Sequence, residues 1–236
     1  MKAWTLDELC RMIDHTNLHA DASEADMAEL CHEALANRFA MVAVNQVQSA
    51  ACKQFLAGSD VHVGAAISFP LGQTTIASKV FDTRDAIACG ADEIDYVVNL
   101  TEVKNGRWGY IEDEMTAIVG ACRELGAIVK VIFENCYLAD AEKIRLCEIA
   151  RKVRPDFIKT STGFGTGGAT FDDVRLMVEH VGPDVQVKAA GGIRSAETFL
   201  EFVRLGCTRI GTSAGVAIKA ELEAMLADSG RTTIEL

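Results

Sequence analysis

The stretch "VQVKAAGGIRSAETFLEFVRLGCTRIGTS", residues 185–213, contains two short apolar segments separated by one amphipathic segment. The apolar segments, 185–192 and 208–213, are expected to form strands. The segment between them, 195–206, has the apolar spacing of a helix that packs one face against a sheet. A strand, a helix and a second strand joined by short connections are typical of a right-handed βαβ unit. The two strands are therefore expected to run parallel.

The same alternation recurs along the rest of the chain. Further strands are expected at 39–45, 61–67, 92–99, 127–134 and 156–161, and a weaker one at 12–16. Helical patterns such as 23–37 and 141–153 lie between them. Helix starts are predicted at Ser23 and Thr170, each followed three residues later by an aspartate, and helix ends at Gly58, Gly90, Gly126 and Gly206.

Eight such units in 236 residues predict an α/β protein, a closed (β/α)8 TIM barrel that forms a single domain over residues 1–236. The main alternative is a doubly wound open sheet. That fold usually has a glycine-rich dinucleotide-binding turn after its first strand. The segment "VAVNQVQSA", residues 42–50, has no glycine, so the sequence favours the barrel.

Charge and cysteine content narrow the classes of partner. A formal net charge of −11 disfavours nucleic acid and anionic membrane surfaces. The eight cysteines include no CxxC pair, which indicates reduced thiols and a cytoplasmic protein rather than a zinc site or a disulfide framework. No apolar run has the length of a membrane span. The five histidines are scattered, so no metal site is expected.

Four charged residues interrupt the expected strands near their carboxyl ends: Asp95, Lys130, Lys159 and Lys188. A closed parallel barrel has no edge strands, and its chemistry gathers at these ends. A lysine beside another ammonium in a partly dry pocket loses proton affinity. The reference pKa of lysine is about 10.4, and lowering it by about 3 leaves much of the amine neutral at pH 7. Such an amine can form a Schiff base with a carbonyl substrate.

Two later segments predict a phosphate site. "KAAGGIR" (188–194) and "RIGTSAG" (209–215) each end a strand in glycine with hydrogen-bond donors nearby, before an expected helix start. Loops after the last two strands of such a barrel often bind phosphate through backbone N–H groups and a helix N-terminus. Arg194, Thr212 and Ser213 strengthen this prediction.

Five segments, in order, resemble the deoxyribose-phosphate aldolase family: "GADEIDYVVN" (90–99), "VKVIFE" (129–134), "DFIKTSTGF" (156–164), "VKAAGGIR" (187–194) and "RIGTS" (209–213). The resemblance implies a class I aldolase with a (β/α)8 barrel, which reversibly cleaves 2-deoxy-D-ribose 5-phosphate to glyceraldehyde 3-phosphate and acetaldehyde. It implies no metal and no organic cofactor, and a homodimer is expected because the family is often dimeric.

The resemblance also implies a role for each matching residue. Lys159 would form the Schiff base, and Lys188 would lower its pKa and help to move protons. Asp95 would act with a water as acid and base, and Lys130 would hold that carboxylate and a substrate hydroxyl. The residues implied around the phosphate are Gly163, Gly191, Gly192, Arg194, Gly211, Thr212 and Ser213.

Three positions depart from the family pattern. Ala43 and Gln46 stand where many members have cysteine and proline, and Asn135 stands where threonine is frequent. The tail "RTTIEL" lacks the tyrosine found in some relatives. The closest alternative function is a Schiff-base barrel aldolase for a different phosphorylated sugar. A non-catalytic sugar-phosphate-binding protein is disfavoured, because such a protein is expected to have lost Lys159, Lys188 or Asp95.

Overall fold

Eight parallel strands close into a barrel in the computed structural model, which describes residues 2–236. The barrel strands are β2 (Ile13–Thr16), β3 (Met41–Asn45), β4 (His62–Ile67), β5 (Glu93–Val97), β6 (Ile128–Ile132), β7 (Phe157–Lys159), β8 (Gln186–Ala190) and β9 (Cys207–Thr212). They follow one another around the barrel in chain order, and β9 pairs in parallel with β2 to close it. The predicted TIM barrel is confirmed, and the open-sheet alternative is excluded.

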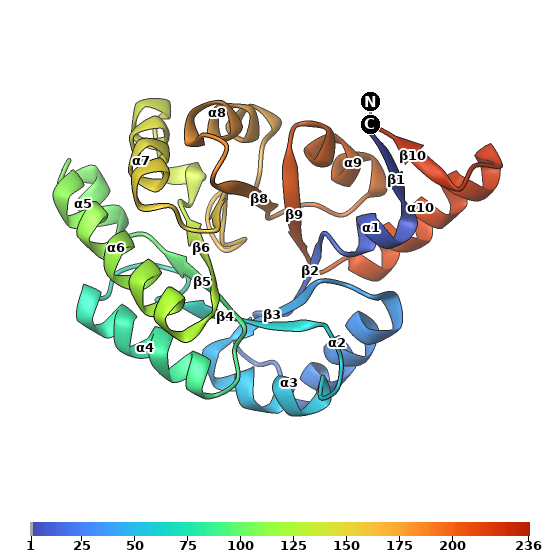
Figure 1. The fold of residues 1–236 in the computed structure, drawn as a ribbon, viewed down its shortest axis with the longest axis horizontal. Helices are drawn as coiled ribbons and strands as arrows, with labels where there is room; N and C mark the ends of the chain where they lie inside the picture. The colour runs from blue at the N-terminus through green and yellow to red at the C-terminus, as the bar shows by residue number, and fades with distance from the viewer. Residues whose placement is uncertain (1) are drawn as a thin grey trace.

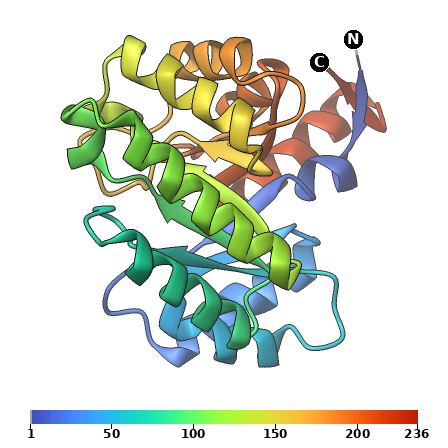
Figure 2. The same cartoon turned by 60° about the vertical axis from the view of Figure 1, so that its left-hand side comes forward.

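Helices follow the strands and form the outer layer, which Figures 1 and 2 show from two directions. The longer ones are α2 (Glu24–Asn37), α4 (Ile76–Ala88), α6 (Trp108–Leu125), α7 (Asp140–Val153), α8 (Phe171–Val181), α9 (Ala196–Arg204) and α10 (Gly215–Ser229). Shorter ones are α1 (Leu6–Cys10), α3 (Ser49–Phe55), α5 (Leu100–Lys104) and the 3-10 turns η1 (Gln46–Gln48) and η2 (Asn135–Tyr137).

Local sequence fixes several helix ends as predicted. The Ser23 hydroxyl accepts the backbone N–H of Asp26, whose carboxylate accepts the N–H of Ser23 in return, so α2 begins with a capping box. The Thr170 hydroxyl accepts the N–H of Asp173 at the start of α8. Gly126 ends α6 in the left-handed conformation, which satisfies the last carbonyls of that helix.

The lumen of the barrel is polar, whereas the layer between strands and helices is apolar. On β5, Ile94 and Tyr96 lie in the apolar core, while the alternate residues Glu93 and Asp95 form ion pairs with residues of other strands. Successive side chains of a strand point to opposite faces. The carboxylates of β5 therefore occupy the lumen, and the strand ends bring Asp95 near the mouth.

A buried ion pair fixes the carboxyl end of β5 from the helix layer. Lys79 of α4 lies 2.6 Å from Glu114 of α6, and both side chains are fully buried. The Lys79 ammonium also donates to the carbonyl of Val97, at 2.7 Å, and Glu114 accepts the backbone N–H of Asn99. These bonds hold the backbone immediately after Asp95, so the helix layer positions a residue of the predicted site.

The two ends of the chain pair outside the barrel. Strand β1 (Ala3–Thr5) runs antiparallel to β10 (Thr233–Glu235), and the termini lie side by side in Figure 1. Neither strand was expected from the sequence, because each has only three residues and its partner lies at the opposite end of the chain. The tail is thus fixed against the N-terminal segment.

Candidate active site

Lys159 is the last residue of β7 and lies at the carboxyl end of the barrel. Its side chain is 4% exposed, and its amine donates to the Asp95 Oδ2 atom at 2.8 Å. In the strand register Lys159 pairs with Ile132 of β6 and with Lys188 of β8. Adjacent strands therefore place two lysines side by side, as the sequence predicted.

Asp95 is the centre of a cluster of three lysines. Lys188 donates to the same Oδ2 atom as Lys159, also at 2.8 Å, and Lys130 donates to Oδ1 at 2.7 Å. Burial alone would raise the pKa of Asp95, but these three ammonium groups hold it well below its ordinary value. The four residues of the predicted catalytic set are thus joined by direct contacts.

The surroundings of Lys159 favour its neutral form. Burial lowers its pKa to about 8; the charges of Lys188 and Lys130 add to this effect, and Asp95 opposes it. At pH 7 about one amine in ten is then neutral, against about one in 3,000 for an ordinary lysine. The site therefore supplies a nucleophilic amine near neutral pH.

A cavity of about 280 Å³ opens above Lys159. It is lined by all seven residues predicted to surround a phosphate: Gly163, Gly191, Gly192, Arg194, Gly211, Thr212 and Ser213. Thr16, Leu18, His19 and Phe164 complete parts of its wall, and the sequence did not indicate them. The structure thus brings the amine and the predicted phosphate residues to one cavity, whereas Lys130, Lys188 and Asp95 lie below it and do not line it.

The glycine turn after β8 is closely packed. Gly191 has φ +92°, which few other residues adopt, and a side chain at Gly168 would come within 2.2 Å of the Gly191 carbonyl oxygen. Gly168 therefore packs against the turn. The Thr212 hydroxyl donates to the Ile193 carbonyl at 2.7 Å, so it ties the two loops together. Within residues 2–236 the exposed guanidinium of Arg194 forms no hydrogen bond or ion pair.

A family model described as DeoC/LacD family aldolase matches residues 9–220, which is most of the chain. The chain belongs to the DeoC/LacD family of aldolases. The protein is therefore an aldolase, an enzyme of the lyase class.

Individual relatives agree with this membership. The chain is 58% identical over 233 residues to a deoxyribose-phosphate aldolase of Lactobacillus acidophilus, with 99% of this chain and 98% of the relative covered. It is 49% identical over 214 residues to a deoxyribose-phosphate aldolase of Bacteroides thetaiotaomicron, with 91% of this chain and 90% of the relative covered.

Solved structures of aldolases superimpose closely. One from Coccidioides immitis, a putative deoxyribose-phosphate aldolase, has a TM-score of 0.89 at 34% identity and covers 94% of this chain and 88% of its own. A deoxyribose phosphate aldolase from Aeropyrum pernix, described as tetrameric, has a TM-score of 0.87 at 29% identity, with 94% and 93% covered.

Three charged residues of the aldolase lumen escaped the prediction: Asp14, Glu93 and Arg209. Glu93 is two residues before Asp95 on β5, so it points into the lumen one layer lower. Asp14 and Arg209 come from β2 and β9, which meet where the barrel closes. The sequence does carry a sign of these residues, because each is a charged residue within an apolar strand segment. Their positions along the chain do not show that the three side chains meet.

Glu134, two residues after the end of β6, holds the loop that follows Lys159. Its carboxylate accepts the backbone N–H of Thr162 at 3.0 Å and also the Thr162 hydroxyl. Burial raises the pKa of Glu134, while its bonds to Thr162 and the charge of Lys159 oppose that shift. The position of Gly163 in the cavity wall therefore depends on the carboxylate of Glu134.

Within residues 2–236 the Lys159 amine bonds to Asp95 and to none of the three residues that depart from the family pattern. Ala43 is a buried residue of β3, paired with Thr16 and Gly64. The Gln46 amide donates to Asp85 of α4 at 2.9 Å. The side chain of Asn135 points to Met177 of α8, with its amide nitrogen 3.2 Å from the sulfur, and so does not alter the bonds of Glu134.

Two kinds of feature are absent from residues 2–236. No helix in that range is long and apolar enough to cross a membrane. No three histidine, cysteine, aspartate or glutamate side chains in it gather as metal ligands would.

Proposed function

We infer that this aldolase reversibly cleaves 2-deoxy-D-ribose 5-phosphate to glyceraldehyde 3-phosphate and acetaldehyde through a Schiff base on Lys159. One observation carries the inference: a buried amine with a pKa of about 8 opens into a cavity lined by glycine turns and Arg194. The amine suits an aldehyde carbon, and the turns suit a phosphate. The names of the relatives, deoxyribose-phosphate aldolases, agree with both.

Covalent attachment begins when the neutral amine of Lys159 attacks C1, the aldehyde carbon of the open-chain sugar. The carbinolamine loses water and becomes an iminium ion. Asp95 lies 2.8 Å from the amine, and we assign it the proton transfers of this step, acting with a water. Lys188 holds the same carboxylate oxygen and supports the neutral amine.

Carbon–carbon cleavage then uses the iminium as the electron sink. Asp95, acting through a water, takes the proton of the C3 hydroxyl as the C2–C3 bond breaks. The pair of electrons from that bond forms the C1–C2 double bond of an enamine, and the π pair of the iminium returns to the nitrogen. C3 becomes the aldehyde carbon of glyceraldehyde 3-phosphate, which leaves. Protonation of the enamine at C2, followed by addition of water to the iminium, releases acetaldehyde and the free amine.

The other predicted residues hold the groups that react. We propose that Arg194, the glycine turns and the N-terminus of α10 bind the phosphate at one end of the cavity. Lys130 is fully buried beneath Asp95 and donates to it at 2.7 Å. Its proposed role is therefore limited to holding that carboxylate, without contact to the substrate hydroxyl.

We also propose that residues 1–236 form one barrel domain. The protein is taken as cytoplasmic, which the eight free thiols support. A homodimer stays an expectation from the family resemblance.

Reduction with borohydride in the presence of acetaldehyde, followed by peptide mass mapping, tests the covalent step. We expect an ethyl group on Lys159 and on no other lysine, because among the lysines of residues 2–236 Lys159 alone combines a pKa of about 8 with access to the cavity. An adduct at a different lysine, or none, contradicts the mechanism.

The Lys159→Leu variant should lose turnover yet still bind 2-deoxyribose 5-phosphate in calorimetry, because the phosphate turns are intact. A panel of phosphorylated aldoses tests the substrate. Faster cleavage of another sugar phosphate than of 2-deoxyribose 5-phosphate would overturn the substrate assignment and leave the Schiff base in place.

A further inference from the structure

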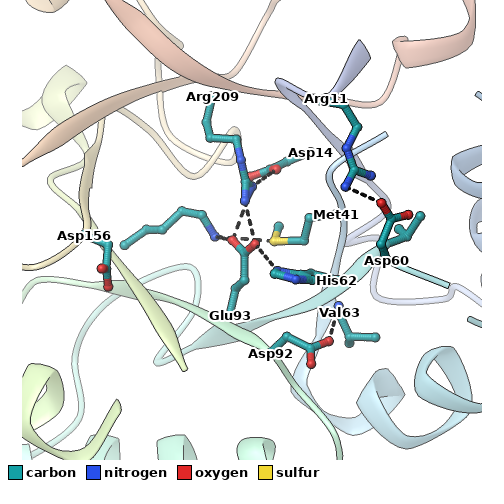
Figure 3. A network of polar contacts seen from close by, with 12 residues as sticks. Arg11, Asp14, Met41, Asp60, His62, Val63, Asp92, Glu93, Asp156 and Arg209 are labelled. Atoms are coloured by element: carbon teal, nitrogen blue, oxygen red, sulfur yellow. Dashed lines mark hydrogen bonds and ion pairs between the residues drawn. The ribbon is translucent and has the colours of Figure 1, made fainter. Parts of the chain in front are cut away.

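An arginine links two carboxylates in the lumen beneath the site. Arg209 of β9 places one guanidinium nitrogen 2.5 Å from Asp14 Oδ1 and the other 2.5 Å from Glu93 Oε1. Figure 3 shows the guanidinium between the two carboxylates, with His62 on the far side of Glu93. The side chains of Asp14 and Glu93 are fully buried, and that of Arg209 is 10% exposed. The bidentate contact fixes both carboxylates in a site nearly closed to water.

Each of these carboxylates holds one of the lysines that contact Asp95. Glu93 forms an ion pair with Lys130. Asp14 lies 2.5 Å from the ammonium of Lys188. The lower layer, Asp14, Glu93 and Arg209, is therefore joined to the upper layer around Asp95 by two ion pairs. One runs through Lys130 and the other through Lys188, and both of these lysines contact the Asp95 carboxylate that holds Lys159.

The formal charges of this connected group are unequal. It contains three carboxylates, Asp14, Glu93 and Asp95, and four basic groups, Lys130, Lys159, Lys188 and Arg209. If all seven were ionised, the lumen would hold one uncompensated positive charge, which burial penalises strongly. Lys159 is the member that makes one ion-pair contact, whereas Lys130, Lys188 and Arg209 each make two. Loss of its proton balances the group.

We propose that Arg209 and Glu93 are positioning residues that set the charge balance around Lys159 from one layer below it. This inference rests on the proposed Schiff-base role of Lys159. It assigns a function to two residues that do not line the cavity and do not touch the reacting carbons. They act through Asp14 and Lys188 on one side and through Lys130 on the other.

The groups that face this pair come from several strands. Besides Asp14, Arg209 faces the ring of Phe157, whose centroid lies 5.6 Å from the guanidinium carbon. Glu93 faces Lys130 and also His62 of β4, whose Nδ1 atom lies 2.8 Å from Oε1.

Around Lys159 itself the charged neighbours are Asp95, Lys188 and Lys130, and Glu134 of the loop after β6 also acts on it. The hydrogen bond to Glu93 raises the pKa of His62, which is half-exposed at the opposite end of the barrel. His62 therefore keeps its positive charge to a higher pH than an ordinary histidine does, and the pKa of Lys159 is compared between variants above the pH at which His62 has lost its proton.

Variants that remove the charge of Glu93 or of Arg209 are expected to shift the pKa of Lys159 in opposite directions. Glu93→Gln removes a negative charge, so the lumen becomes more positive and the pKa of Lys159 should fall. Arg209→Gln removes a positive charge, so that pKa should rise. A unit charge about 10 Å away at an effective dielectric constant near 20 changes a pKa by about 1. A pair that only supports the fold would not give shifts of opposite sign.

The titration of Lys159 can be measured without any substrate. Protein labelled with 13C at lysine Cε is titrated by NMR, and the Lys159 signal is identified by its absence in Lys159→Leu. We expect a pKa lower by about 1 in Glu93→Gln and higher by about 1 in Arg209→Gln. The double variant should return close to the wild-type pKa, because the two charges that it removes are opposite in sign.

Two controls separate charge from packing. Arg209→Lys keeps the charge and loses the forked contact, so the pKa of Lys159 should stay near the wild-type value. Glu201→Gln breaks an exposed ion pair with Arg204 on α9 and should leave the signal unchanged. Shifts of the same sign in the two single variants, or none, would overturn the proposal. Because no sugar enters the titration, a wrong substrate assignment leaves this result valid.

Discussion

Replacement of Lys188 by methionine tests the electrostatic account of the Schiff-base lysine. Methionine keeps the length of the buried side chain and removes its charge. Gly211 leaves the room that this side chain occupies, because a Cβ there would lie 3.2 Å from Lys188 Cε. The variant should therefore fold, and its effect should come from charge.

The contacts of Lys159 and Lys188 with Asp95 give the size of the expected change in the pKa of Lys159. Lys159 and Lys188 each donate to Asp95 Oδ2 at 2.8 Å, so their nitrogens are at most twice that, 5.6 Å, apart. Two unit charges at 5.6 Å repel by about 3 kcal/mol at an effective dielectric constant near 20, which corresponds to about 2 in pKa. Without Lys188 the pKa of Lys159 should rise from about 8 to about 10.

The assay is kcat/KM for cleavage of 2-deoxyribose 5-phosphate between pH 6 and 10.5. At pH 7 the neutral fraction of Lys159 falls about 100-fold, and the rate should fall with it. Near pH 10 the deficit should shrink to within about 3-fold. Lys152→Met, which removes an exposed lysine, should match the wild type throughout. A loss of the same size at every pH would refute the argument, because it would show that Lys188 itself transfers the limiting proton.

Three further predictions follow from the site. Arg194→Ala should raise KM for the phosphorylated sugar about 10-fold or more, with little change for unphosphorylated deoxyribose; equal losses for both in steady-state kinetics would count against a phosphate role. Gly168→Ala places a Cβ 2.2 Å from the Gly191 carbonyl oxygen, so the free energy of unfolding measured in urea should fall by about 1–3 kcal/mol and KM should rise. The control Gly120→Ala, whose Cβ would lie in open space on α6, should neither lower the free energy of unfolding nor raise KM. The pKa values of Glu93 and Asp95 lie below their ordinary range, so the two carboxylates stabilise the fold above pH 4–5 and lose that effect as the pH falls. The urea concentration at the unfolding midpoint should therefore decrease when the pH is lowered below about 4, and it should decrease less steeply in Glu93→Gln. A midpoint that does not change with pH would contradict this.

Much of the fold was predictable because its signals are local. The alternation of short apolar runs with amphipathic helices predicted eight βα units, and caps such as Ser23 set helix ends within one or two residues of the structure. The β1–β10 pair was not predictable, since three-residue strands carry almost no periodic signal and their pairing depends on where the two chain ends meet. The same limit applies to the Lys79–Glu114 pair, which joins two helices across 35 residues.

By itself, the sequence determined that this protein is a barrel with lysines and an aspartate at its mouth and glycine turns after its last two strands. Those features depend on residue type and on position within a strand, which the chain carries locally. Only the tertiary structure decided which charges meet. Asp14, Glu93 and Arg209 come from strands up to 195 residues apart, and closure of β9 onto β2 makes them neighbours. In that closed, nearly dry lumen, charges must balance across the whole group, and so the protonation of Lys159 depends on residues that no local pattern connects to it.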